Sequence, residues 1–247
     1  MLEDDIKVAL ISYLRDKNKN YSNSIIASEF VFDNFSRRAD LLLIDSGRFF
    51  AYEIKSEFDS LIRLEGQIEQ YLDYFDKLTL VVAPKHLKSA LAKSPECVEV
   101  LEIKDNKFKL IRRGKINKKH NPEKLLKLLK VKELKSLAKK FGGTNETRKE
   151  LIVNSLLTLA HPFLKNYVVE TISSRFKYSS EAFKLVSCER DICTDDLKLL
   201  SNSKFIKLNK RDISKTFNHV DEKMEAMQKS SNELVFGEPP MYIKKLL

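Results

Sequence analysis

The sequence contains no tryptophan and only three cysteines, six glycines and six prolines. The cysteines, Cys97, Cys188 and Cys193, form no Cys-x-x-Cys pair, and no histidine lies at a metal-binding spacing from them. This absence argues against a zinc site and against a cysteine–histidine nucleophile. A small, odd number of cysteines is typical of reduced thiols, so the sequence predicts a cytoplasmic protein.

Long apolar runs are also missing from the sequence. No stretch approaches the roughly 20 consecutive apolar residues that a membrane-spanning helix needs. The first ten residues, MLEDDIKVAL, are acidic and do not have the basic start and apolar core of a signal peptide. We therefore expect no membrane partner.

Acidic residues are outnumbered by basic ones, 35 to 45, which gives a formal net charge of +10. Such an excess suits a polyanionic partner, most simply nucleic acid. The base composition of an AT-rich genome also enriches lysine and asparagine and depletes tryptophan, so charge alone leaves both explanations open. The 247 residues are enough to bury the core of one large domain or of two to three smaller units.

Residues 37–71, RRADLLLIDSGRFFAYEIKSEFDSLIRLEGQIEQY, predict two strands, a short loop and a helix. Asp-Ser-Gly at 45–47 supplies the residues of a tight hairpin turn. A turn of two or four residues puts Asp40 directly opposite Glu53. Lys55 shares the face of Glu53, because side chains alternate along a strand. Two carboxylates and one ammonium group are therefore expected to meet at the end of this hairpin.

Like charges that face each other across two strands repel. Both strands are otherwise apolar, so the acidic pair is expected beside a core, where a divalent cation would relieve the repulsion. Mg²⁺ prefers carboxylate oxygens, water and phosphate oxygens, and we expect Mn²⁺ to substitute for it. A lysine beside the metal can orient or deprotonate a water molecule. The alternative is a hairpin whose polar side chains simply face solvent.

The pattern resembles the PD-(D/E)XK nuclease superfamily. The Asp/Glu-x-Lys pattern recurs elsewhere in this charged chain, but only one copy has an upstream aspartate across a turn and a downstream Gln-x-x-x-Tyr helix. That helix is similar to the RecB-type branch. The run RADLLLI … YEIKS … RLEGQIEQY … LTLVV also resembles a little-characterised bacterial group. The resemblance covers about residues 1–115, with Ala39 where the superfamily has proline. The residues that carry it are Asp40, Glu53, Ile54, Lys55, Gln67 and Tyr71.

The resemblance implies an α/β fold, a restriction-endonuclease-like sandwich with a mixed sheet flanked by helices. It implies that Asp40, Glu53 and the Ile54 carbonyl hold Mg²⁺. It also implies that Lys55 activates the water with help from Gln67. In relatives a further acidic residue assists the metal; here Glu29 is the better candidate and Glu3 the alternative, and either can equally be a surface carboxylate.

The elements around the hairpin fit the same fold. Proline and glycine positions and apolar periodicity predict the following order: a helix at 3–16, a strand at 24–32, the hairpin, a helix at 59–76, a buried parallel strand at 77–82, a basic helix after Pro84 and a second hairpin at 98–113.

Several basic and aromatic residues near the hairpin are candidates for nucleic-acid binding. Arg37 and Arg38 can hold phosphates as planar forks, or one of them can brace the carboxylates by ion pairing. Arg63 lies on the exposed stripe of the following helix. Tyr71 can touch a phosphate or pack in the core.

After Gly114 the composition becomes strongly basic. Residues 116–161 predict helices around Gly142-Gly143 and are similar to a SAP-type DNA-binding module, with a capping-box pattern from Thr147 to Glu150. The alternative is a solvated helical hairpin packed on the core. The positive face would include Lys135, Lys139, Lys140, Arg148 and Lys149, which would bind phosphates without sequence preference.

Residues 162–247 carry no recognised motif and predict a mixed, mainly helical region. Helical segments alternate there with NYVVETI and KFIKLNKRDI. A late helix is expected at 222–234, and an extended end at 236–247 because two prolines oppose helix formation.

The resemblance as a whole implies a Mg²⁺-dependent nuclease, an enzyme that hydrolyses phosphodiester bonds in DNA. Cutting of both strands by one site per chain would favour a homodimer. Two alternatives remain open. One is a non-cleaving DNA-binding adaptor with the same fold, and the other is an RNA-cleaving defence effector or toxin.

Overall fold

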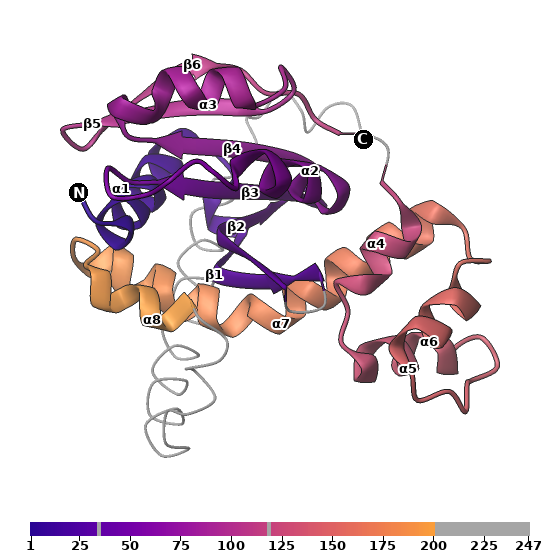
Figure 1. Cartoon of the computed structure of the whole chain (residues 1–247). Helices are drawn as coiled ribbons and strands as arrows, with labels where there is room; N and C mark the ends of the chain where they lie inside the picture. The colour runs from indigo at the N-terminus through magenta and orange to yellow at the C-terminus, as the bar shows by residue number, and fades with distance from the viewer. Residues whose placement is uncertain (34–35, 118–119, 201–247) are drawn as a thin grey trace, which may run out of the picture. The chain divides into compact units, whose positions relative to one another are not determined.

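A six-stranded mixed sheet, in the order β1-β2-β3-β4-β5-β6, lies at the centre of the described part of the chain (Figure 1). The first three strands are antiparallel neighbours, β4 and β5 run parallel to β3, and β6 is again antiparallel. This arrangement confirms the predicted α/β class with a mixed sheet. The strands are β1 (Ile25–Phe32), β2 (Arg37–Asp45), β3 (Arg48–Lys55), β4 (Lys77–Val82), β5 (Glu99–Lys104) and β6 (Lys107–Arg112).

The structure is a computed structural model that describes residues 1–33, 36–117 and 120–200. The chain divides into two compact units, Met1–Phe205 and Ile206–Leu247, and the described residues lie in the first. The segment KFIKLNKRDI, the expected late helix at 222–234 and the expected extended end lie outside the described residues. None of the described helices is long and apolar enough to cross a membrane.

The helices occupy the start of the chain, the connections between strands and most of the second half, which confirms the mainly helical C-terminal half. They are α1 (Glu3–Lys17), α2 (Leu64–Tyr74), α3 (Leu87–Lys93), α4 (Pro122–Lys127), α5 (Val131–Lys139), α6 (Lys149–Leu156), α7 (His161–Glu189) and α8 (Leu197–Leu200).

Three local predictions are wrong. The helix expected at 59–76 begins only at Leu64, because Asp59 instead closes a turn by accepting hydrogen bonds from the Ser56 amide and hydroxyl. The segment NYVVETI does not interrupt the helices, since it lies inside α7. The N-cap residue of α6 is Arg148 and not Thr147, and no side chain caps this helix end with a hydrogen bond. The capping box predicted from Thr147 to Glu150 therefore does not form.

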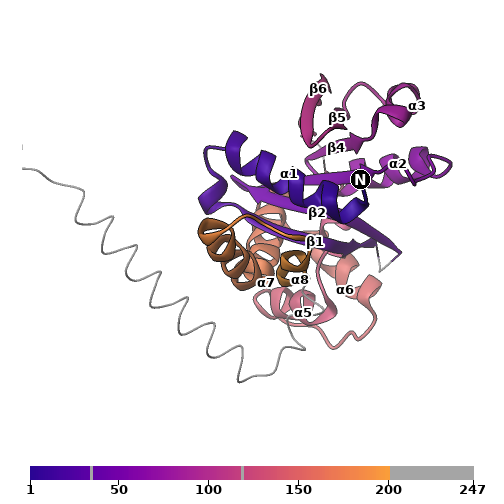
Figure 2. The same ribbon diagram turned by 90° about the vertical axis from the view of Figure 1, so that its left-hand side faces the viewer.

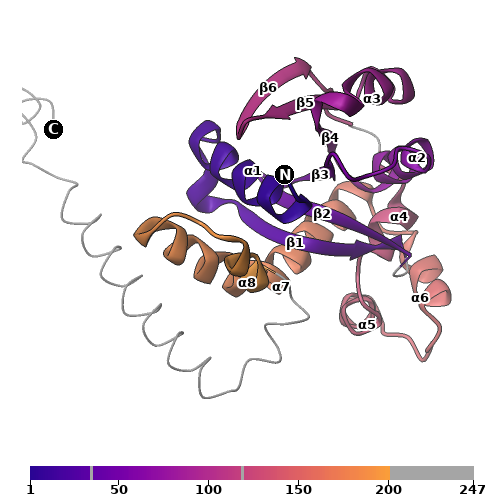
Figure 3. The ribbon, with the colours of Figure 1, turned by 60° about the vertical axis from the view of Figure 1, so that its left-hand side comes forward.

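The two faces of the sheet pack against different helices. Leu42 and Ile44 of β2 belong to a core shared with α2 and α4–α7, whereas Leu41 and Leu43 belong to a core shared with α1, α8 and the end of α7. Figure 2 and Figure 3 show α1 lying across the sheet. The alternation of β2 side chains thus produces two buried faces, as expected for a strand in the middle of a layered α/β fold.

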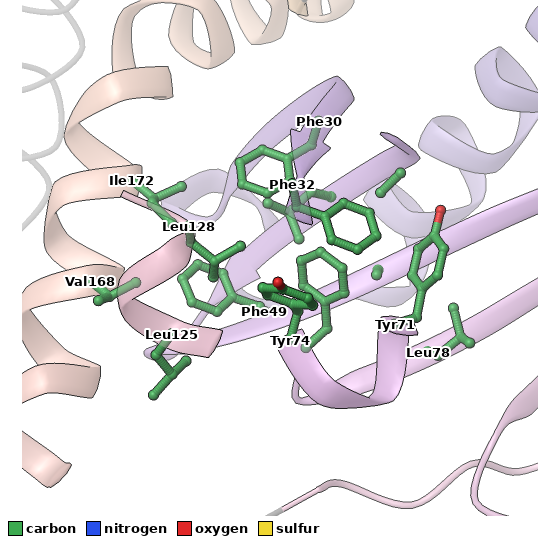
Figure 4. Close-up of a cluster of buried hydrophobic side chains, with 14 of the residues drawn as sticks. Phe30, Phe32, Phe49, Tyr71, Tyr74, Leu78, Leu125, Leu128, Val168 and Ile172 are labelled. Atoms are coloured by element: carbon green, nitrogen blue, oxygen red, sulfur yellow. The ribbon is translucent and has the colours of Figure 1, made fainter. Parts of the chain in front are cut away.

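The helices of the basic region pack on the same core as the sheet. Leu125 and Leu128 lie beside Val168 and Ile172 of α7, next to the ring of Phe49 from β3 (Figure 4). Burial of these apolar side chains attaches the second half of the described chain to the strands. The division at residues 1–115, 116–161 and 162–247 stays a prediction.

The hairpin register agrees with the prediction. Ile44 pairs with Phe49 and Asp45 with Arg48. Ser46 and Gly47 at the turn both have positive φ, 49° and 74°, as a two-residue hairpin turn requires. Continued in this register, the pairing brings Asp40 to the level of Glu53, so the turn sets the position of the acidic residues at the opposite end of the hairpin.

A buried ion-pair network around Asp76 joins α7 to the sheet. The Asp76 carboxylate accepts hydrogen bonds from the Phe49 amide at 2.7 Å and from the Lys165 ammonium at 2.6 Å, and its other oxygen lies 2.9 Å from His120 Nε2. Burial alone would raise the pKa of Asp76, but the bonds from His120, Lys165 and Phe49 outweigh it and lower the pKa. Sequence patterns gave no indication of this network.

We predict that Asp76→Ala lowers the free energy of unfolding at pH 7 by roughly 3 kcal/mol, because it leaves Lys165 and the Phe49 amide buried without their partner. A lowered carboxyl pKa stabilises the fold above the unfolded-state pKa and stops doing so as pH falls through the folded-state value. The variant should therefore also lose less stability on acidification. Urea denaturation at pH 7 and pH 3 measures both effects.

Asp73→Ala is the matched control, since Asp73 is about half exposed and, among the residues that the structure describes, pairs with Lys124 at 3.3 Å. That variant should change stability by less than about 1 kcal/mol. Equal stability of the two variants at pH 7 would contradict the role given to Asp76.

Candidate functional site

The candidate site lies where β2 and β3 stop pairing. Leu41 and Tyr52 form the last backbone pair at this end of the hairpin. One residue beyond, the Asp40 carboxylate accepts a hydrogen bond of 2.6 Å from the Ile54 amide. The Asp40 side chain thus satisfies a backbone donor of β3, and it does so while only 8% exposed. This contact fixes the position of the carboxylate at the end of the strands.

Glu53 is nearly fully buried and both of its carboxylate oxygens are occupied. Oε1 accepts a hydrogen bond of 2.6 Å from the Lys55 ammonium, and Oε2 accepts one from the Tyr71 hydroxyl. The Tyr71 oxygen also lies 3.0 Å from the carbonyl of Arg38. Tyr71 is thus buried and hydrogen-bonded at this site.

The acidic pair carries the electrostatic repulsion that the sequence indicates. Burial, and next the charge of Glu53, raise the pKa of Asp40 well above its usual value, and the hydrogen bond from Ile54 only partly opposes this. Burial and the charges of Glu53 and Asp40 also raise the pKa of Tyr71. The site therefore disfavours a second negative charge unless a cation is present.

Two further carboxylates approach Asp40 from other elements. Glu3 comes from the first turn of α1, and Glu29 comes from β1, where its φ of 58° breaks the regular strand. One carboxylate oxygen each from Glu3, Glu29 and Asp40 lie within 4.8 Å of one another. The sequence left Glu3 and Glu29 as alternatives, and the structure brings both to Asp40.

The three carboxylates fit a hard divalent cation. Such ions prefer carboxylate oxygens, and oxygens that share one ion about 2.1 Å from each are at most about 4.2 Å apart. A group no wider than 4.8 Å needs only a small closing movement to reach that geometry. Glu53 is not one of the three residues of this group. Its oxygens bind Lys55 and Tyr71. The ligand set of Asp40, Glu53 and the Ile54 carbonyl stays a prediction.

Basic side chains already neutralise part of this charge. The ammonium of Lys7, on α1, lies 2.6 Å from Glu29 and 3.2 Å from Glu3, and its side chain is 1% exposed. Arg38 Nε lies 2.5 Å from the second oxygen of Glu29, which is the bracing role predicted as its alternative. Sequence reasoning missed Lys7, although its position four residues after Glu3 on a helix is a usable signal.

The remaining predicted residues lie around or away from this cluster. Arg37 binds the Gln70 side chain, Gln67 is half-buried on α2, and Arg63 is exposed at the start of α2. Of the basic residues predicted for the second half, Lys135, Lys139, Lys140 and Arg148 are exposed.

Lys149 does not join the exposed basic face. Its ammonium donates a hydrogen bond of 2.7 Å to the Lys127 carbonyl. Burial, followed by the charges of Arg175 and Lys127, lowers its pKa. Its contacts indicate a packing role between helices.

We predict that Asp40→Asn raises the free energy of unfolding at pH 7, in EDTA, by on the order of 1 kcal/mol. The amide still accepts the Ile54 hydrogen bond but removes the repulsion with Glu53. A carboxyl group with a raised pKa costs stability as pH rises from the unfolded-state to the folded-state value, and the variant escapes this cost. Urea denaturation measures the change.

The exposed Asp16 gives the control Asp16→Asn, for which we expect no change beyond about 0.5 kcal/mol. A less stable Asp40→Asn protein in EDTA would show that Asp40 is held by favourable charge interactions and not by repulsion.

Comparison with known proteins gives a different family from the one that the motif indicates. The family model described as bacteriophage P4 protein cII matches residues 1–201. Protein cII of Enterobacteria phage P4 is 34% identical over 209 residues, which cover 82% of this chain and 78% of that protein. Among solved structures, the SPO1766 protein of unknown function from Silicibacter pomeroyi covers 57% of this chain and 94% of its own, with 17% identity and a TM-score of 0.38.

These matches overturn the predicted membership of the PD-(D/E)XK nuclease superfamily. The predictions that depended on it are wrong as well: a nuclease, a phosphodiester hydrolase and an enzyme. The physical reason is that an Asp…Glu-x-Lys pattern determines which charges meet at the end of a hairpin. It does not determine what those charges do.

Proposed function

The chain belongs to the bacteriophage P4 protein cII family, and on that premise we propose that it is a nucleic-acid-binding protein. In this proposal Glu3, Glu29 and Asp40 would hold a divalent cation, which would supply positive charge for a phosphate of DNA. The role is binding and does not include cleavage.

The observation that carries the proposal is the convergence of Glu3 and Glu29 on Asp40, whose carboxyl group is buried and costly to ionise, so that three carboxylates form one group. They come from α1, β1 and β2, within 4.8 Å of one another, in a chain whose formal net charge is +10. Concentrating negative charge in one place costs stability, and a bound cation would offset this cost.

A divalent cation would supply positive charge to which a phosphate oxygen can bind directly, as Mg²⁺ or Mn²⁺ does with substrate phosphates elsewhere. The chain's own residues hold the ligands in place. Ile54 orients Asp40, while Arg38 and Lys7 orient Glu29. Lys55 and Tyr71 fix Glu53 behind them.

Basic side chains supply the rest of the proposed interaction. The Arg38 side chain is 59% exposed beside Glu29 and can donate to a neighbouring phosphate. Lys135 and Lys139 are exposed on α5, and Arg148 is exposed at the start of α6. Each phosphate that such residues neutralise adds affinity that does not depend on sequence and weakens as salt rises.

We predict that Mg²⁺ strengthens binding of the full chain to a short duplex DNA at least tenfold relative to EDTA. Asp40→Asn and Glu29→Gln should each remove most of this gain, while binding in EDTA changes little, because the cation and not the carboxylate contacts the phosphate. Fluorescence anisotropy of labelled DNA at fixed ionic strength measures the effect. Glu96→Gln, at an exposed acidic position on the loop before β5, is the matched control.

Equal binding with Mg²⁺ and EDTA would contradict the cation bridge. The same samples analysed on a denaturing gel should contain intact strands. Cut strands that depend on Mg²⁺ and on Asp40 would overturn the assignment of a binding role.

A further inference from the structure

The side chain of Lys7 is the least exposed of the charged side chains around Asp40, at 1% exposure. A lysine of this kind is rarely buried unless it is paired. Here the pairing is extensive, because the ammonium lies 2.6 Å from Glu29, 3.2 Å from Glu3 and 3.6 Å from Asp4. Lys7 is therefore held almost entirely by carboxylates.

Two of these carboxylates, Glu3 and Glu29, are also two of the three proposed cation ligands. The Glu29 oxygen that faces Lys7 is Oε1, while Oε2 faces Arg38. A divalent ion that binds Glu29 must therefore share an oxygen with a basic side chain or displace one. The ammonium and the divalent ion compete for the same negative charge.

The anchoring of α1 keeps the ammonium in this position. Ile6, Leu10 and Ile11 bury the same face of the helix in the core under the sheet, so the Lys7 side chain starts from a fixed backbone. Only the ammonium end can move without loss of the apolar packing, since the lysine stem is flexible.

We propose that Lys7 is a built-in counter-cation that occupies the charge of the Glu3–Glu29–Asp40 site and sets how tightly the site takes a divalent cation. The inference rests on the proposed cation site and adds the residue that determines its affinity. When the site holds a divalent cation, the Lys7 ammonium would turn away from Glu29, and it would return to Glu29 when the site is empty.

The size of the effect follows from simple electrostatics. A unit positive charge about 4 Å from a divalent ion opposes binding of that ion, even at an effective dielectric constant of about 20. Solvent and movement of the lysine reduce this repulsion. We expect its removal to tighten binding at least tenfold.

The experiment compares Mn²⁺ binding by the natural full-length chain and by Lys7→Met, followed as loss of the free Mn²⁺ signal in electron paramagnetic resonance. Lys7→Met keeps the length of the side chain and removes the charge, so we expect an Mn²⁺ dissociation constant at least tenfold lower. Lys7→Arg keeps the charge and should bind Mn²⁺ like the natural chain. Lys17→Met, at an exposed lysine on the same helix, should have no effect.

A second measurement shows whether Lys7→Met is folded. Its thermal midpoint should be lower than that of the natural chain in EDTA, because the carboxylates lose their counter-charge. Mn²⁺ should raise the midpoint of Lys7→Met by more than it raises that of the natural chain.

The outcomes separate this inference from the proposed function. Binding by the natural chain with no tightening in Lys7→Met would overturn the role of Lys7 alone. Binding only by Lys7→Met would support Lys7 as the counter-cation and overturn a cation-bridged function for the natural chain. Binding by neither protein would overturn both.

Discussion

The structure of the site depends on one electrostatic constraint, the crowding of carboxylates around Asp40 where β2 and β3 separate. Burial, and next the charge of Glu53, raise the pKa of Asp40, whose carboxylate accepts a hydrogen bond from the Ile54 amide. Such a group is costly to ionise. The fold compensates by placing Lys55 against Glu53 and Lys7 against Glu29.

Each of these compensating contacts comes from a different layer of the fold. Lys55 lies on the same strand as Glu53, and Tyr71 reaches Glu53 from α2. Lys7 reaches Glu29 from α1. The sheet brings acidic residues that repel one another together. Of the helices that cover it, α1 supplies the positive charge of Lys7 and α2 supplies the hydroxyl donor of Tyr71, and both contacts stabilise this arrangement. The site is therefore part of the folding energetics.

The sequence was sufficient for the local geometry and insufficient for the function. The Asp-Ser-Gly turn predicted the hairpin register, and that register predicted the acidic residues at its end. Alternation and apolar runs predicted the strands, and the resemblance to the nuclease superfamily implied the mixed sheet. The positive φ of Glu29 and the contact of Lys7 with Glu29 depend on how α1 packs over the sheet. No local sequence pattern predicts that packing. The Asp76 network likewise joins residues far apart in the chain.

The nuclease prediction failed for a related reason. A short motif on a hairpin describes charges that meet, whereas the match to bacteriophage P4 protein cII extends over residues 1–201 and includes the helices that surround those charges. The longer match carries the information about the whole chain. The motif remains informative about the site, since Asp40, Glu53 and Lys55 do come together, but their chemistry must be established by binding measurements.

The most direct test of the central claim is the anomalous scattering of Mn²⁺ in a crystal of the full chain grown or soaked with this ion. We predict one peak at which carboxylate oxygens of Glu3, Glu29 and Asp40 lie about 2.1 Å from the ion, with the Lys7 ammonium turned away. A crystal at millimolar Mn²⁺ with no peak at these residues, or with Lys7 still bound to Glu29 beside a peak elsewhere, would contradict the account.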